Sequence, residues 1–196
     1  MHNKMPVDYR IIYEVIPDGS SVLDLGCGDG ELIYCLQEQK HAYVQGIELD
    51  DDLVHKCVER GVHVFHGDIE SGLKEYPNKA FDYVILNQSM QQLKKVDDVI
   101  YESLRIGRKV IVGFPNFAHY KARFQLFFKG SAPVTYALPY HWYDSPNLHF
   151  LSIKDFKEFC LDKKIKVEKT YFLAEKRGVH LLPNIFAKNA VFIISV

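Results

Sequence analysis

Apolar and polar positions along this chain follow two alternating periods. Short runs rich in β-branched and aromatic residues predict five strands before residue 115; they cover Val22–Gly26, Val44–Glu48, Val62–His66, Phe81–Asn87 and Lys109–Phe114. Between them, apolar residues recur every three or four positions over Glu31–Gln39, Asp52–Arg60 and part of 87–105, which predicts helices. Strands that alternate with helices form a parallel sheet covered by helices on both faces. We therefore expect a doubly wound α/β fold.

Two further strand-like runs lie near the C-terminus, at Lys166–Leu173 and Ala190–Val196. The segment RGVHLLPN between them is shorter than the roughly dozen residues that a crossover to a parallel neighbour requires. These two strands are therefore expected to pair as an antiparallel hairpin at one edge of the sheet.

Residues 115–152 interrupt this alternation with an aromatic- and proline-rich stretch. Five aromatic residues fall on one helical stripe: Phe117, Tyr120, Phe124, Phe127 and Phe128. We predict that this stripe forms a packed helix, although its aromatic density also suits an apolar substrate or a partner surface. The following run, SAPVTYALPYHWYDSPNLHF, has no clear period and predicts a long functional loop. Residues 1–196 are thus expected to form one domain with an insertion at about 115–152.

Composition narrows the classes of function. Hydrophobic residues make up 47% of the 196 positions, and the net charge is −1, from 24 basic and 25 acidic side chains. Nucleic-acid-binding proteins neutralise phosphates and usually carry a clear basic excess, so this balance disfavours a nucleic-acid partner. No apolar run approaches the ~18 residues of a membrane-spanning helix, and the N-terminal stretch lacks the apolar core of a signal peptide. These features predict a cytoplasmic protein without membrane contact.

The strongest chemical signal is a glycine-rich loop directly after the first predicted strand. The sequence VLDLGCGDG places Asp24 before the turn and glycine at positions 26, 28 and 30. Glycine accepts positive φ and lets the backbone approach a ligand, so a strand, such a loop and a helix together are typical of nucleotide sites. The dinucleotide fingerprint requires its third glycine one position later, where this chain has Glu31. The spacing therefore favours a nucleoside ligand without a pyrophosphate.

Polar residues also follow the second, third and fourth predicted strands. Glu48 lies 20 residues after Gly28, at a position where a carboxylate can accept hydrogen bonds from both hydroxyls of a ribose. Asp68 is placed to accept from the exocyclic amine of adenine, with Ile69 against the ring, and Asn87 ends the buried fourth strand. Each of these alone could be a surface charge or a loop cap. Together at one sheet edge they predict a nucleoside site.

The four cysteines, Cys27, Cys35, Cys57 and Cys160, lack the paired spacing of zinc or redox sites, so no metal site is predicted. Cys27 lies within the glycine loop, where a small side chain is needed; a role as a nucleophile is the alternative. Cys160 shares a helical stripe with two phenylalanines and is interpreted as a core residue.

In this order, the segments VLDLGCGDG, GIELD, HGDIE and FDYVILNQSMQQL resemble the motifs of the class I S-adenosylmethionine-dependent methyltransferases. A later stretch, PVTxALPYxWYDSPNxH within residues 113–156, resembles the MetW family of methionine biosynthesis proteins. The matching segments span most of the chain. The superfamily resemblance implies a Rossmann-like sheet of seven strands in the order 3-2-1-4-5-7-6, with the last strand antiparallel, and S-adenosyl-L-methionine as the cofactor.

The same resemblance assigns positions to the cofactor, which are Asp24, Gly26, Cys27, Gly28, Glu48, Leu49, Asp68, Ile69 and Asn87. The glycine-loop positions would lie along its amino-acid end, Glu48 would hold the ribose, and Leu49 would lie beside the adenine. Asp68 and Ile69 would recognise the adenine, and Asn87 would lie near the methionine portion.

Two functions remain open at this point. The first is methyl transfer to a small-molecule substrate, a reaction that needs no catalytic motif because the sulfonium donor is already activated. A base is required only for an acceptor that loses a proton. Candidates in the insertion are His119, His141 and His149, with Tyr140 and Tyr143 as supporting donors, although each histidine could equally be a surface or hydrogen-bonding residue. No catalytic residue is therefore assigned.

The second function follows from the MetW resemblance, which implies an accessory protein that binds and activates a homoserine O-acyltransferase of the MetX type. The nucleoside would then report methionine status, provided that it favours one partner-competent state. The expected contact is the segment 118–149, where Trp142 and the tyrosines suit interface anchors. An NAD-dependent dehydrogenase is a more distant third alternative, which tight binding of NAD would favour.

Overall fold

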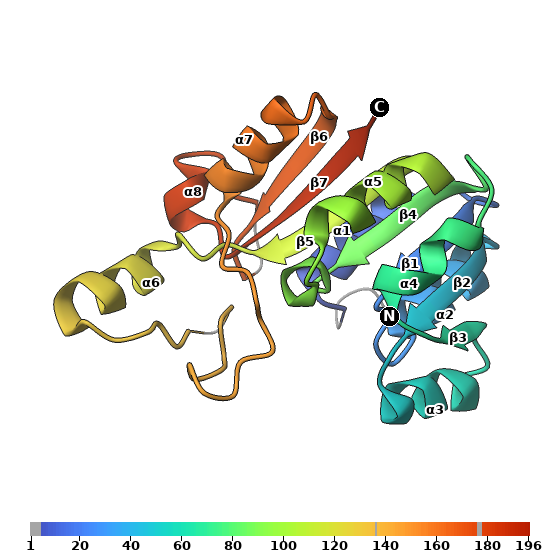
Figure 1. The fold of residues 1–196 in the computed structure, drawn as a ribbon, viewed down its shortest axis with the longest axis horizontal. Helices are drawn as coiled ribbons and strands as arrows, with labels where there is room; N and C mark the ends of the chain where they lie inside the picture. The colour runs from blue at the N-terminus through green and yellow to red at the C-terminus, as the bar shows by residue number, and fades with distance from the viewer. Residues whose placement is uncertain (1–4, 136, 176–177) are drawn as a thin grey trace.

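A seven-stranded sheet runs through the centre of the protein, with helices on both faces (Figure 1). The computed structural model describes residues 5–135, 137–175 and 178–196. The strands are β1 Ser21–Leu25, β2 Tyr43–Glu48, β3 Val64–His66, β4 Phe81–Asn87, β5 Gly107–Pro115, β6 Lys166–Leu173 and β7 Asn189–Ser195. Their order is β3-β2-β1-β4-β5-β7-β6; β7 is antiparallel to both of its neighbours, and the other pairs are parallel. This confirms the predicted fold, including the strand order.

The helices predicted after the first and second strands correspond to α2 and α3, and the helix expected within 87–105 corresponds to α5. The α-helices of the described residues are α1 Val7–Val15, α2 Glu31–Lys40, α3 Asp51–Glu59, α4 Ile69–Gly72, α5 Val96–Ile106, α6 Tyr120–Phe124, α7 Ile153–Asp162 and α8 Pro183–Phe186. Short 3-10 turns form at η2 Leu73–Glu75 and η3 Met90–Gln92, and a π-helical turn, η4, spans Gln125–Lys129. Within the described part of the chain, none of these helices combines the length and the apolar character needed to cross a bilayer.

The two C-terminal strands pair antiparallel, as predicted. The connection between them spans residues 174–188, so it is longer than RGVHLLPN and its length alone does not exclude a crossover. Their register runs from Lys166 opposite Ser195 to Leu173 opposite Asn189, and the short helix α8 lies in the connection. β7 lies between β5 and β6, so β6 becomes the edge strand of the sheet.

Side chains alternate between the two faces of each strand and so build two separate cores. Along β4, Val84 and Leu86 belong to the core beneath α4, α5 and α7, whereas Ile85 belongs to the core beneath α1, α2 and α3. All three side chains are fully buried. Because both faces of β4 are covered, its sequence is a continuous apolar run rather than an alternating one.

Helix α1 is an element that the sequence analysis did not predict. Charged residues interrupt its apolar positions, but Ile12 on its inner side and Ile16 at its C-cap are both completely buried in the second core. α1 therefore covers the same face of the sheet as α2. Its first turn carries a buried acid, Asp8, which becomes important for the site described below.

Gly46 in β2 has no room for a side chain. A Cβ there would lie 2.6 Å from Cys27 Sγ and 2.6 Å from Ile33 Cδ1, both in the buried core. We expect Gly46→Ala to lower the free energy of unfolding by about 2–3 kcal/mol, because overpacking forces buried side chains out of their preferred rotamers. Gly72→Ala is the matched control, since nothing lies within 4 Å of its Cβ position. Urea unfolding measures both variants, and equal midpoints would contradict this expectation.

The arm is the segment of residues 116–152 between β5 and α7. Figure 1 shows it leaving the body after β5, forming α6 away from the sheet and returning to α7 through an extended loop. Its aromatic stripe is helical over residues 120–129, as predicted, but the prediction that this helix is packed is wrong, because Phe124, Phe127 and Phe128 are 55%, 82% and 67% exposed. Helical spacing shows that residues share one face; it does not show that another element covers that face.

The returning end of the arm is tied to the turn after β4. The backbone N–H groups of Leu148 and His149 both donate to the carbonyl oxygen of Gln91 in η3, at 2.9 and 3.0 Å. In the same turn, Ser89 Oγ donates to the carbonyl oxygen of Leu25 at the end of β1, at 2.8 Å. One short turn thus connects the base of the arm with the end of β1.

Candidate functional site

The loop between β1 and α2 lies at the carboxyl ends of the parallel strands. We call this loop, together with Glu48–Asp50, the glycine-loop edge. Gly26, Gly28 and Gly30 all have positive φ, of 78°, 60° and 74°. A Cβ on Gly26 would lie 2.8 Å from the Cβ of Ser89, so packing requires glycine there. Nothing lies within 4 Å of the Cβ position of Gly28, so its backbone borders open space. The loop therefore combines a packed turn with an accessible one, as a ligand-binding loop requires.

Glu48 holds this loop against the end of β2. Its Oε2 accepts from the backbone N–H of Gly28 at 2.9 Å, and its Oε1 accepts from the N–H groups of Leu49 and Asp50 at 2.8 and 3.0 Å. An ionised carboxylate offers about four acceptor positions, so one on Oε2 is free for a ligand hydroxyl. The structure thus brings Glu48 and Gly28, both predicted site residues, into direct contact.

Asp24 is a buried acid next to the same loop. Its side chain is at the end of β1 and only 3% of the residue is exposed. Burial, with the charge of Glu48 as the second cause, raises the pKa of Asp24 to about 7. Among the described residues, no hydrogen bond to its carboxyl group is one of the causes of this shift. A buried carboxyl group without a donor is costly, so a cationic ligand group at this position would stabilise it.

The residues assigned to adenine lie around the ends of β2 and β3. Leu49 is 62% exposed, so an apolar side chain is accessible directly after β2. Asp68 caps α4: its Oδ1 accepts from a backbone N–H of that helix at 2.9 Å, which leaves Oδ2 for another donor. Ile69 is buried, and its Cδ1 lies 3.6 Å from the Cβ position of Gly26. Leu49 and Asp68 thus present accessible groups, whereas Ile69 packs beside the glycine loop.

Asn87 at the end of β4 is bonded to α1. Its Nδ2 donates to Asp8 Oδ2 at 3.0 Å, although the two residues are 79 positions apart. Its Oδ1 is buried, has no partner among the described residues, and occupies the space where a Cβ on Gly113 would lie. α1 also brings Tyr9 near Asp24. Burial raises the pKa of Tyr9, and the charges of Asp24 and Asp8 raise it further. The first turn of α1 therefore belongs to the site.

Sequence reasoning missed three residues of this site: Asp8, Tyr9 and Ser89. The amphipathic pattern of residues 7–15 could have identified α1. It could not have shown that α1 docks against the end of β4, because that contact joins distant positions. Ser89 belongs to no motif. Its place directly after β4 is the one signal that could have indicated a contact with the glycine loop.

Cys27 contributes its backbone to the loop and its side chain to the core. It is 3% exposed, its Sγ lies 4.0 Å from Cys57 Sγ, and Cys57 Sγ donates to the carbonyl oxygen of Gly28 at 3.2 Å. Burial raises the pKa of the Cys27 thiol strongly. A thiol that stays protonated is a poor nucleophile, so the structure favours a packing role for Cys27.

The candidate histidines of the arm have separate partners. His119 is buried as the N-cap of α6, and burial, followed by two nearby lysines, lowers its pKa. His149 Nε2 lies 2.9 Å from a carbonyl oxygen in the turn after β4. His141 stacks on Tyr143 with ring centroids 5.4 Å apart, and both Tyr140 and Tyr143 are exposed. No catalytic base is assigned from these contacts.

The fold and the glycine-loop edge define the class of protein: a class I S-adenosylmethionine-dependent methyltransferase fold. A solved SAM-dependent methyltransferase from Archaeoglobus fulgidus is similar over 97% of this chain and 93% of its own, with a TM-score of 0.69 and 15% identity. The [4+2]-cyclase SpnF is similar over 95% of this chain and 79% of its own, with a TM-score of 0.65 and 16% identity. At these identities the likeness shows the fold alone, and the fold hosts more than one reaction.

The family model described as "Methionine biosynthesis protein MetW" matches residues 6–194, and the chain belongs to this family. A relative from Rhodopirellula baltica, the bifunctional methionine biosynthesis protein MetXA/MetW, is 31% identical over 187 residues, which cover 91% of this chain. The chain spans 30% of the length of that relative.

Proposed function

We propose that this chain binds S-adenosyl-L-methionine at the glycine-loop edge and acts as an accessory protein of a homoserine O-acyltransferase in methionine biosynthesis. The observation that carries ligand binding is the presence of two acids at the glycine loop: Glu48 accepts from the N–H of Gly28, and its charge also acts on the buried Asp24. The accessory role is supported by the Rhodopirellula baltica relative, whose name joins MetXA and MetW in one protein. The MetW resemblance implies that the MetX-type component is the acyltransferase.

The residues at this edge fit the ligand. The carboxyl group of Asp24 would pair with the ammonium group of its methionine portion, and the free position on Glu48 Oε2 would accept from a ribose hydroxyl. The exposed side chain of Leu49 would lie against the adenine, and Asp68 Oδ2 would accept from its amine. Open space beside Gly28 allows the backbone to approach the ligand. When bound, S-adenosyl-L-methionine supplies a sulfonium that activates its methyl group toward displacement.

Methyl transfer to a small metabolite is the second candidate, and His119 is the observation that favours it. Burial lowers the pKa of His119 and so favours the neutral imidazole, the form that a general base requires. It lies at the start of α6, in the segment that follows β5. A general base at this position would serve an acceptor that loses a proton on methylation.

Calorimetry and an activity assay test the proposal. Titration with S-adenosyl-L-methionine and S-adenosylhomocysteine should give dissociation constants on the order of micromolar; no binding at millimolar ligand would refute the site. The acyltransferase should be several-fold more active with this chain present, and the increase should depend on the ligand. Transfer of labelled methyl groups to a metabolite, with unchanged acyltransferase activity, would instead support the second candidate.

A further inference from the structure

The arm exposes aromatic side chains at unusual density. Phe127 and Trp142 are 82% and 80% exposed, and Phe128 and Tyr143 are 67% and 69% exposed. Contiguous exposed apolar surface is uncommon on monomeric proteins and marks interaction sites, and aromatic residues are enriched at the centres of protein interfaces. The arm therefore exposes to solvent the residue types that are typical of the centre of a protein interface.

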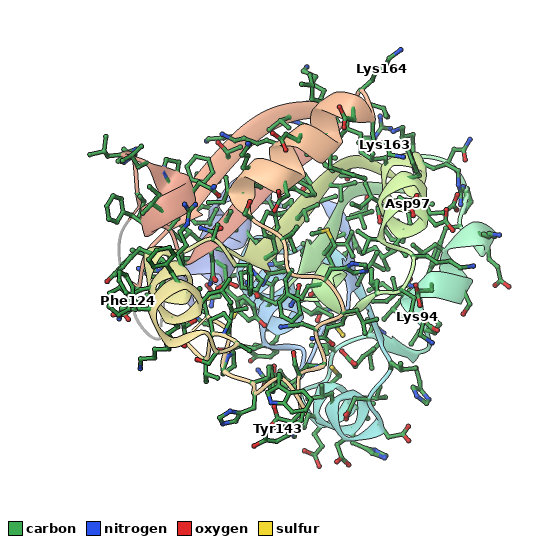
Figure 2. All side chains as sticks on the ribbon, turned by 60° about the vertical axis from the view of Figure 1, so that its left-hand side comes forward. Lys94, Asp97, Phe124, Tyr143, Lys163 and Lys164 are labelled. Atoms are coloured by element: carbon green, nitrogen blue, oxygen red, sulfur yellow. The ribbon has the colours of Figure 1, made fainter. Side chains whose placement is uncertain are left out.

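These side chains form two clusters on different parts of the arm. On α6 and η4, the ring centroids of Phe124 and Phe128 are 4.5 Å apart, and those of Phe127 and Phe128 are 4.8 Å apart. On the returning loop, which comprises residues 137–152, the ring centroids of Trp142 and Tyr143 are 5.7 Å apart. Figure 2 shows Phe124 and Tyr143 at the outer boundary of the molecule. Contacts within each cluster restrict the rings, which reduces the side-chain freedom that binding removes.

A small apolar cavity lies between η4 and the returning loop. It measures about 250 Å³, and its lining includes Leu126 from η4, Leu138, and Trp142 and Phe150 from the returning loop. Interface hot spots are typically side chains that fill such pockets and are surrounded by contacts that exclude water. This cavity is large enough for one apolar side chain of a partner.

Charge on the arm has one dominant sign. The segment 118–149 contains Lys121, Arg123 and Lys129 but a single acidic residue, Asp144, although the whole chain carries a net charge of −1. A complementary surface would be apolar with an acidic rim, because opposite potentials steer association and suppress wrong pairings. Two copies of this arm would instead place cations opposite cations, which disfavours a second copy of the chain as the occupant.

We infer that the arm is the docking surface for the acyltransferase, which inserts an apolar side chain into the arm cavity and places acidic groups opposite the arm's cations. This inference rests on the proposed function. The Rhodopirellula baltica relative supports the choice of occupant, because its MetXA and MetW parts belong to one polypeptide. In Figure 1, α6 lies on the opposite side of the molecule from α3, the helix that follows the glycine-loop edge.

Two arm variants and one matched control test the inference. Phe127→Ser and Trp142→Ala each should raise the dissociation constant for the acyltransferase from the same organism by more than about tenfold. Leu161→Ser on α7 removes a side chain that is 77% exposed and should change it by less than about twofold. All three variants should keep the thermal unfolding midpoint and the S-adenosyl-L-methionine affinity of the wild type, because the replaced side chains are exposed.

Lys129→Glu tests the charge complementarity separately. Binding should weaken about threefold or more at low ionic strength, and the difference from wild type should shrink at about 1 M salt, where exposed charges are screened. A difference that does not depend on salt would contradict the acidic rim.

The outcomes distinguish the inference from the function on which it rests. If the wild-type chain does not bind the acyltransferase, the proposed function fails, and the inference fails with it. If wild type and both arm variants bind with equal affinity, the proposed function stands and the inference is refuted. Sedimentation that shows a wild-type dimer and monomeric arm variants, with acyltransferase binding unchanged, would assign the surface to a second copy and also refute it.

Discussion

Replacing Glu48 with alanine is expected to weaken the binding of S-adenosyl-L-methionine by about 100-fold, or about 3 kcal/mol. The ribose would lose its acceptor, and the backbone N–H groups of Gly28, Leu49 and Asp50 would lose theirs. Without these bonds the glycine loop is no longer held to β2, so binding must also order the loop. Calorimetric titration of the purified variant measures the loss.

Glu48→Gln and Glu59→Ala serve as controls for this prediction. The glutamine amide keeps one acceptor oxygen but presents an NH2 group to backbone donors, so we expect an intermediate loss of about tenfold. Glu59 is an exposed acid at the end of α3, and its removal should leave the affinity within about twofold of wild type. Wild-type affinity in Glu48→Ala would show that the ribose is not held at this edge.

Asp24→Asn is expected to change stability and ligand binding in opposite directions. At pH 8 the ligand-free variant should be more stable than wild type by about 2–4 kcal/mol, because asparagine places no charge in the buried position. The ammonium group of the ligand would lose its charged partner, so the affinity should fall by about 30-fold or more. Weaker binding by a more stable protein cannot be attributed to unfolding.

The pH dependence of this effect follows from the raised pKa of Asp24. That pKa is about 7 in the folded protein against an ordinary value of 3.8, so between these values the folded state binds more protons than the unfolded state. Wild-type stability should therefore fall as the pH rises from about 4 to about 7 and then level off. Glu48, Asp8 and Tyr9 also face this region, but the variant keeps them, so the comparison isolates Asp24.

Urea unfolding of wild type and Asp24→Asn at pH 5 and pH 8 measures this difference directly. We expect the stability advantage of the variant to be larger at pH 8, and we expect ligand affinity to rise with pH in wild type only. A stability difference that is the same at both pH values would contradict a folded-state pKa of about 7 for Asp24.

The parts of this protein that could be predicted depend on local sequence and on general topology. The strands followed from apolar runs, to within one or two residues at most of their ends. The antiparallel pairing of β6 with β7 was predicted correctly, but the connection spans residues 174–188, so its length did not require that pairing. Periodicity alone gave only a parallel sheet; the strand order came from the superfamily resemblance. Asp24 and Glu48 could be placed at one edge because parallel strands share the edge at which their carboxyl ends lie.

The parts that could not be predicted depend on contacts between distant residues. The bond between Asp8 and Asn87 spans 79 positions, and no local pattern of either residue indicates the other. Exposure is equally non-local: the spacing of Phe124, Phe127 and Phe128 is the same whether or not another element covers them. Only the path of the arm away from the sheet decides that they remain in solvent.

The turn at η3 links two events that occur on different parts of the surface. Gln91 accepts backbone hydrogen bonds from Leu148 and His149 at the base of the arm, and nearby Ser89 bonds to Leu25 beside the glycine loop. An enzyme bound to the arm and a metabolite in the loop would therefore be connected through this one turn. If binding at the two places is coupled through this turn, thermodynamic reciprocity requires that each ligand changes the affinity of the other by the same factor. On the proposed function, the concentration of a methyl donor would in this way set how much acyltransferase is engaged, without any bond to the sulfonium being broken.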